Sequence, residues 1–350
     1  MTTSFFLTKW LYLAMSWVYD SMCNLFATSS GGWVVVLTIL IFTIGIKGIT
    51  LFTDISSRKS SIKMQAIQPD LDKLKKKYGD DPQRLNVEQR KLMKERGVSS
   101  FGGCLPMLFM FPLLIMFWNA FRAWSNAQTL DLLIQIYNGN GLATFEGYKF
   151  LWITNIWQPD NLAAGGTLMN ASTFWSTFTS TYPLHNSIFY EKNADILNEI
   201  LYKLHFLTRS AEGELIFAKD GGAAFQTAYA SYVSVITNSI KGGYENMSNG
   251  FAILPLLAGA SSFLSAFISQ KNNPQAQAKD KDGEKPQGAG MTKAMMYVMP
   301  LISVFFCYQY NATFAFYWTF SNLVSLGVTV VLNHTMFKKK PDNGEVMKKL

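Results

Sequence analysis

The chain has 350 residues and a formal net charge of +8, and 49% of its residues are hydrophobic. Its apolar residues gather in runs that approach the roughly 20 residues needed to cross a bilayer, which excludes an ordinary soluble protein and favours a polytopic membrane protein. The 3 cysteines and 3 histidines lack metal-ligand spacing, and no nucleotide-binding loop or hydrolase elbow occurs, so the sequence predicts no enzyme, no metal site and no cofactor.

Residues 1–28 predict an amphipathic helix that lies in the outer membrane interface. The apolar positions recur every three or four residues, at Trp10, Leu13, Ala14 and Trp17. The segment has no charged start and no small-residue cleavage site, so we expect no cleavable signal peptide here. The alternative is an ordinary core helix packed inside the protein.

Five apolar runs follow, and each is expected to cross the membrane as a helix, which makes the fold an all-α bundle. They cover residues 31–54, 103–124, 251–270, 292–310 and 313–335. Lys and Arg concentrate in the connections at 55–100 and 271–291 and in the tail at 336–350, whereas the long connection at 125–250 holds few of them. By the positive-inside rule the basic segments are cytoplasmic, so the N-terminus is expected outside and the C-terminus in the cytoplasm.

The first cytoplasmic connection, residues 55–100, predicts a helical hairpin. A Gly-Asp-Asp-Pro turn at 79–82 divides two charged helices, at 58–78 and 83–96, and Pro69 is expected to break the first of them. Both apolar stripes are short, so we expect the hairpin to be mobile and to receive a binding partner. The alternative is a solvated charged surface without a specific role.

The outer connection contains a second region of amphipathic pattern, residues 165–245. Apolar residues recur at helical spacing from Ile196 to Leu207 and from Phe225 to Ile240. Polar residues between them argue against a sixth span. We expect two or three helices that bury their stripes against one another or in the outer interface.

One basic residue stands inside the first expected span. Lys47 lies about 10 Å of helix rise before the first polar residues near Asp54. A charge at membrane depth costs roughly 2.5–3.5 kcal/mol on insertion scales. Either the side chain snorkels to the cytoplasmic interface, or it faces water held inside the bundle, and the residues alone leave both readings open.

Several short motifs resemble, in order and spacing, the YidC-type membrane protein insertases, a superfamily that includes mitochondrial and chloroplast members. The motifs are Ile44–Gly48, Gln68–Pro69, Gly79–Asp81, Gly102–Pro106, Pro112, Leu151–Asn155, Met299–Pro300, Phe305–Phe306 and Tyr317–Leu323. The resemblance covers residues 1–160 and 250–338. At position 47 this family usually carries arginine; lysine keeps the charge but lacks the planar donor fork.

The resemblance implies a five-helix bundle around a hydrophilic groove that opens to the cytoplasm and to lipid. Lys47 matches the basic residue of that groove, and Thr43 lies one turn before it on the same helix face. Further residues expected to line the groove or its lipid-side lip are Ser262, Ser265, Trp318 and Asn322. The residues expected to guide an apolar substrate segment along the lipid side are Phe251, Leu254, Phe263 and Phe314. For Thr43 and Ser262 the alternative is helix packing by small residues.

The function implied by the resemblance is that of an insertase and chaperone in the bacterial plasma membrane. It would receive nascent membrane proteins and release their spans laterally into lipid, without a nucleotide or another cofactor. The ribosome, the Sec translocon and the lipid bilayer are the expected partners, and DNA is not. The alternatives are a small secondary transporter or channel that uses Lys47, or a chaperone that acts after insertion. Residues 165–245 are additional to the compact form of the family and are expected to be dispensable for insertion.

Overall fold

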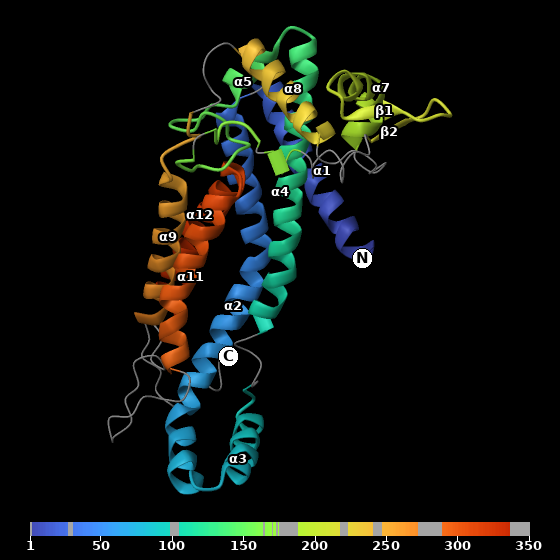
Figure 1. Ribbon diagram of the computed structural model, residues 1–350. Coiled ribbons are helices and arrows are strands. Elements are labelled where there is room, and N and C mark those ends of the chain that lie inside the picture. Colours follow the sequence, from blue (N-terminus) through green and yellow to red (C-terminus); the bar gives the residue numbers. More distant parts are fainter. Residues whose placement is uncertain are drawn as a thin grey trace. The chain divides into compact units, whose positions relative to one another are not determined.

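The structure is a computed structural model that describes residues 2–26, 31–98, 105–163, 165–169, 171–172, 174, 188–217, 223–240, 247–271 and 289–336. This part of the chain is mostly helical (Figure 1). Its helices are α1 (Thr2–Leu25), α2 (Gly32–Tyr78), α3 (Pro82–Glu95), α4 (Leu105–Tyr137), α5 (Gly141–Gly147), α7 (Ile188–Lys203), α8 (Ala223–Ile240), α9 (Ile253–Lys271), α11 (Ala289–Gln309) and α12 (Ala312–Met336). Two strands, β1 (Leu207–Arg209) and β2 (Leu215–Phe217), pair antiparallel.

The expected spans coincide with helices in the structure. Two helical stretches are long and apolar enough to cross a membrane alone, Gly32–Phe52 of α2 and Ala312–Val331 of α12. Shorter apolar stretches occur in α9 and α11, at Ile253–Ser269 and Met296–Gln309. Helix α4 starts at Leu105 and covers the second expected span. Helices α2 and α4 continue beyond the expected spans, to Tyr78 and Tyr137. The five crossings, their bounds and their direction stay predictions.

Helix α1 forms at the N-terminus as expected, but it buries a different stripe from the one read in the sequence. Met15, Tyr19 and Cys23 are buried at intervals of four residues, and the Tyr19 ring meets the edge of Trp124 in α4 with 5.6 Å between ring centroids. Trp10 and Trp17 are exposed. The tryptophan side of the helix therefore faces outward, where tryptophan suits a membrane interface.

The chain divides into two compact units. Unit 1 comprises Met1–Ile41, Met116–Leu257 and Val304–Trp318, and unit 2 comprises Phe42–Ile115, Ala258–Ser303 and Thr319–Leu350. Unit 1 contains α1, most of α4 and the long connection that follows it, and unit 2 contains α3 and most of α9, α11 and α12.

In unit 1, the loop at 153–160 is tied to helices that are distant in sequence. Ser125 of α4 donates a hydrogen bond from Oγ to the carbonyl oxygen of Trp157 at 2.9 Å. The backbone N–H of Ala312, at the start of α12, donates to the carbonyl oxygen of Gln158 at 2.9 Å. These bonds satisfy backbone carbonyls that a buried loop would otherwise leave without partners.

The same loop ends on a buried carboxylate that caps α9 from outside the helix. Asp160 accepts hydrogen bonds from the backbone N–H groups of Ala252 at 3.0 Å and Leu254 at 2.8 Å, and from the indole N–H of Trp152 at 3.1 Å. A carboxylate at a helix N-terminus satisfies the donors of the first turn and complements the helix dipole. Gly250 is required beside it, because a Cβ at that position would lie 2.0 Å from Asp160 Oδ1.

The described part of residues 165–245 contains two helices and a small sheet. Helix α7 ends at Lys203, earlier than the expected run to Leu207, and His205 has a left-handed backbone with φ 64°. Leu207 instead begins β1, and its side chain is buried. Phe174, Phe206 and Tyr232 form an aromatic core in this region, with Phe174 stacked on Tyr232 at 3.8 Å between centroids.

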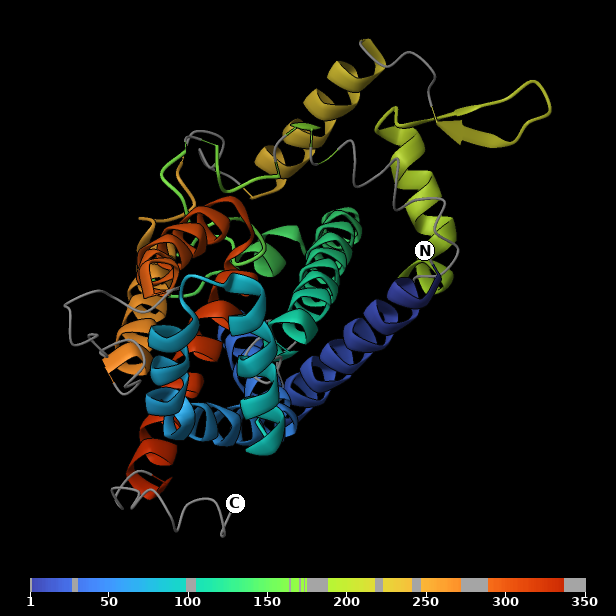
Figure 2. The ribbon, with the colours of Figure 1, turned by 90° about the horizontal axis from the view of Figure 1, so that it is seen from below.

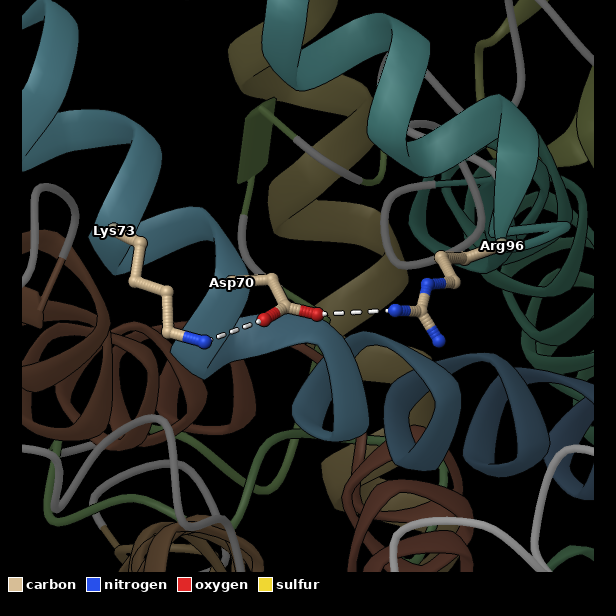
Figure 3. Close-up of polar contacts among 3 residues, drawn as sticks. All are labelled: Asp70, Lys73 and Arg96. Carbon is tan, nitrogen blue, oxygen red and sulfur yellow. Dashed lines mark hydrogen bonds and ion pairs between the residues drawn. The ribbon is translucent and has the colours of Figure 1, made fainter.

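The helical hairpin in unit 2, formed by the end of α2 and by α3, differs from the expectation at its first helix. Helix α2 continues through Pro69 to Tyr78, because one proline removes a single backbone donor and a long helix can retain the bonds on either side. Figures 1 and 2 show α3 running antiparallel beside the end of α2. Asp70 accepts from Arg96 at 3.3 Å and from Lys73 at 3.2 Å (Figure 3). Helix α3 has no buried residue, whereas Ile67 of α2 and Val98, three residues after α3, are buried.

Candidate functional site

The candidate site begins with a polar face on α2 in an otherwise apolar stretch. Thr43, Lys47 and Thr50 follow each other at intervals of four and three residues, which places them on one side of the helix. Thr43 is fully buried and Lys47 is half-buried, and Thr50 donates from Oγ1 to the carbonyl oxygen of Lys47 at 3.4 Å.

The opposite side of the same stretch is apolar and exposed. Ile49 and Phe52 are 81% and 78% exposed. Lys47 therefore lies on the less exposed side of α2, away from the surface that suits lipid. Sequence reasoning selected Thr43 and Lys47 but missed Thr50, although its spacing of three residues from Lys47 is the signal that would have found it.

A second polar group in unit 2 joins three helices. Asn322 of α12 donates from Nδ2 to Ser262 Oγ of α9 at 2.7 Å, and Ser262 Oγ lies 2.9 Å from Ser303 Oγ of α11. Ser303 donates onward to the carbonyl oxygen of Met299 at 2.9 Å. Because each hydroxyl carries one proton, Ser262 must donate to Ser303, and the chain of donors runs from Asn322 to Met299.

This series of hydrogen bonds brings two of the expected groove residues together. Ser262 and Asn322 are brought into direct contact, and Ser303, which the sequence reading missed, completes the group. Ser303 was hidden because a single serine in an apolar helix carries no periodic signal. Hydrogen bonds between membrane helices contribute about 0.6 kcal/mol each on average, so these bonds orient α9, α11 and α12 more than they stabilise them.

The remaining expected groove residues lie elsewhere. Ser265 follows Ser262 by three residues on α9 and is half-buried. Trp318 belongs to unit 1, where its ring lies 5.6 Å from that of Phe314. Asn322 follows Trp318 by one turn on α12.

The apolar guide residues divide into an exposed and a buried pair. Phe251 and Phe263 are exposed, whereas Leu254 and Phe314 are only 2% and 3% exposed. Phe314 packs inside unit 1, with the rings of Phe121, Tyr310 and Tyr317 at 6.2, 5.6 and 6.4 Å. The buried pair offers no surface to lipid, because neighbouring side chains already cover it.

Phe263 extends into an exposed aromatic row in unit 2. Its ring centroid lies 6.1 Å from that of Phe267 on α9 and 6.1 Å from that of Tyr297 on α11. Phe267 and Tyr297 are 45% and 52% exposed. The sequence reading missed both, although Phe267 lies one turn after Phe263 on the same helix face.

Among the described residues no group of His, Cys, Asp or Glu has the arrangement of a metal site. The polar groups are hydroxyls, amides and one ammonium, which bind by hydrogen bonding and charge. The site can attract an anionic group and hydrogen-bond to polar chain, and it contains no arrangement of nucleophile and base.

Comparison with known proteins identifies the family. The family model described as 60Kd inner membrane protein matches residues 25–208 and 219–340. The chain is 35% identical over 140 residues to the membrane protein insertase YidC of Clostridium tetani, which is 40% of this chain and 54% of the relative. It is 33% identical over 146 residues to the protein of that name from Clostridium perfringens, covering 42% of this chain and 54% of the relative.

A third relative shows the same pattern. The membrane protein insertase YidC of Caldanaerobacter subterraneus is 34% identical over 141 residues, covering 40% of this chain and 60% of the relative. The chain thus spans about half the length of the curated relatives that it matches. The resemblance to YidC-type proteins is confirmed by these matches. Since the family model covers most of its length, the chain belongs to the 60Kd inner membrane protein family.

Proposed function

We propose that the protein is a membrane protein insertase that binds polar segments of nascent membrane proteins beside Lys47 and releases their apolar spans into lipid. The observation that carries the proposal is the polar face of Thr43, Lys47 and Thr50 on a helical stretch that is apolar enough to cross a membrane. A charge at that depth is costly unless it has water or polar partners, so its presence indicates a function.

In this proposal Lys47 acts by electrostatic attraction. A substrate with a short acidic tail would place its carboxylates beside the ammonium, where low polarity strengthens the attraction compared with water. Water and polar groups around Lys47 would also shorten the hydrophobic distance that the tail must cross. No bond is made or broken, so the process needs neither nucleotide nor cofactor.

The driving force would come from the substrate's own apolar span. Partition into lipid gains roughly 25 cal/mol per Å² of apolar surface, and about 20 residues are transferred. The exposed rings of Phe263, Phe267 and Tyr297 provide an apolar route on the outside of unit 2. The hydrogen-bonded Ser262, Ser303 and Asn322 would keep the adjoining helices oriented while the span leaves.

The proposal includes a bacterial plasma membrane location with the N-terminus outside and the C-terminus in the cytoplasm, as the distribution of basic residues indicates. The charged hairpin and the basic tail would then face the ribosome, whose phosphates attract clustered Lys and Arg. The Sec translocon is a further proposed partner. A chaperone role after insertion would use the same polar face.

The test is insertion into proteoliposomes that contain this protein alone. A single-span substrate with an acidic tail is compared with a matched substrate whose tail is neutral. Lys47→Arg should preserve insertion of both, whereas Lys47→Ala should lower insertion of the acidic substrate by roughly 5–30-fold, the equivalent of one or two kcal/mol. Lys203→Ala, at an exposed lysine on α7, is the control and should change neither.

Three outcomes would contradict the proposal in distinct ways. Equal insertion of the acidic substrate by the protein and by Lys47→Ala would exclude the docking role of Lys47. Solute flux without insertion would favour a transporter or channel. Absence of both, together with improved folding of a span inserted by other means, would favour a post-insertion chaperone.

A further inference from the structure

Two loops of unit 1 expose several large apolar side chains while they bury several polar ones. They cover residues 150–163 and 247–252. Their polar residues Asn155, Gln158, Asp160 and Asn249 are buried together with the apolar residues Ile153, Ile156 and Trp157. Four other large apolar residues are exposed instead, namely Leu151, Leu162, Met247 and Phe251, at 76%, 61%, 47% and 63%. Single exposed apolar residues are common on proteins, but four large exposed apolar residues on two joined loops indicate a surface that something apolar covers.

Hydrogen bonds hold the two loops together as one piece. Asn249 accepts from the backbone N–H of Asn155 at 2.7 Å and donates to the carbonyl oxygens of Asn155 and Pro159 at 2.8 and 3.0 Å. Trp152 reaches Asp160, which in turn accepts from the backbone of the second loop. The two loops therefore form one hydrogen-bonded unit that carries the exposed apolar residues. We call these residues, Leu151, Leu162, Met247 and Phe251, the outer rim.

Leu151 adds a second, independent observation. Its backbone has φ 53°, in the left-handed region that glycine and asparagine adopt more easily than leucine. It lies at a tight turn, where Phe150 and Ile153 exchange two backbone hydrogen bonds of 2.9 Å. The conformation of Leu151 is strained, and no other described part of the protein covers its side chain. We interpret this combination as a sign that the side chain contacts an apolar environment outside the protein.

The sequence around the outer rim identifies the kind of environment. From residue 150 to residue 190 the only charged residue is Asp160, which is buried, and residues 247–270 contain none. A surface for a charged protein partner or for water would carry Lys, Arg, Asp or Glu. The second loop also continues directly into the apolar stretch Ile253–Ser269 of α9, only two residues after Phe251.

We propose that the outer rim is embedded in the lipid bilayer, at the boundary between headgroups and acyl chains on the outer side. The apolar side chains enter the lipid, while the buried polar centre satisfies the loop backbone that lipid cannot hydrogen-bond. The rim then fixes the depth at which α9 enters the membrane. This inference is independent of the insertase function, because it concerns lipid contact and not substrate.

Spin-label accessibility tests the embedding directly. Single cysteines replace Leu151, Leu162 or Met247 in a full-length chain whose Cys23, Cys104 and Cys307 are changed to serine, and each carries a nitroxide. The protein is placed in nanodiscs of phosphatidylethanolamine and phosphatidylglycerol, which leave both faces accessible. Power saturation compares collisions with oxygen, which concentrates in lipid, and with a water-soluble nickel complex. Labels at Glu212, in an exposed turn, and at Leu301, exposed on α11, provide the aqueous and lipid references.

We expect the oxygen-to-nickel ratio at all three rim positions to be several-fold higher than at Glu212 and to approach the value at Leu301. A ratio equal to that at Glu212 would overturn the proposal, because the rim would then lie in water. Low collision rates with both reagents would overturn it as well, since they would show that protein covers the rim.

A pair of substitutions tests the rim without a label at the altered positions. The double variant Leu151→Asn and Leu162→Asn removes two exposed apolar side chains. Asparagine tolerates the left-handed backbone at position 151. The double variant should remain folded in detergent and should lower the oxygen-to-nickel ratio of a label at Met247 toward the aqueous reference. An unchanged ratio would show that the rim's apolar side chains do not hold it in lipid.

Discussion

Removing the charge of Asp160, by the isosteric change Asp160→Asn, should loosen the start of α9. The carboxylate receives three donors: Ala252 N–H on Oδ1 at 3.0 Å, and Leu254 N–H and the Trp152 indole N–H on Oδ2 at 2.8 and 3.1 Å. An amide has one acceptor oxygen and one NH₂ group. In either orientation at least one of the three donors therefore faces another donor.

The size of the effect follows from these contacts. Hydrogen bonds to a charged group contribute about 1.5–3 kcal/mol each, and a carboxylate near a helix N-terminus adds about 0.3–1 kcal/mol through the dipole. Asp160→Asn loses one of these bonds outright and weakens the other two from charged to neutral. We expect the free energy of unfolding to fall by about 2–4 kcal/mol.

The assay is thermal unfolding in detergent, followed by the fraction of protein that remains monodisperse. Asp195→Asn, at an exposed position on α7, is the matched control and should lie within about 0.5 kcal/mol of the unchanged protein. Gly250→Ala should be destabilising as well, because its Cβ would lie 2.0 Å from Asp160 Oδ1. Since both changes break the same contacts, the double variant should lose less than the sum of the two. An Asp160→Asn protein as stable as its control, or strict additivity with Gly250→Ala, would refute this account of the cap.

Three further predictions concern regions outside this cap. Amide exchange should be faster across residues 60–95 than in the spans, because the hairpin pairs through exposed contacts such as Asp70–Arg96; uniformly slow exchange would exclude a mobile hairpin. Burial raises the pKa of the Asp131 carboxyl, which lies beyond the second expected span, so the stability that this carboxyl contributes is present at low pH and is lost as pH rises through its folded pKa. Asp131→Asn should flatten that part of the profile of stability against pH, and an unchanged profile would contradict the raised pKa. Replacement of residues 165–245 by a Gly/Ser linker should leave insertion intact, because the aromatic core of this region is its own; stable protein without insertion would show that the region belongs to the mechanism.

The sequence by itself determined the helices and the position of the charge. Long apolar runs predict α2, α9, α11 and α12, because a membrane span requires a continuous stretch of mostly apolar residues. Lys47 could be selected without a structure for the same reason, since a cation within twenty apolar residues is conspicuous whatever surrounds it. Thr43 followed from helical spacing alone.

Only the tertiary structure decided which faces meet and which residues act together. Leu254 and Phe314 read as lipid-facing in the sequence but are buried, and α1 turns its tryptophans outward while Met15, Tyr19 and Cys23 pack inward. In a chain where nearly every position of a span is apolar, hydrophobicity no longer distinguishes the lipid side from the protein side.

The polar contacts depend on tertiary structure even more strongly. Asn322 and Ser262 are 60 residues apart, and Asp160 and Leu254 are 94 residues apart, yet each pair is in hydrogen-bond contact. No local pattern specifies such a pair, because each side chain is compatible with its own helix or loop whether or not the partner is present. Their meeting is decided by the packing of whole helices and loops within each unit, and that packing brings isolated polar side chains into hydrogen-bonded groups.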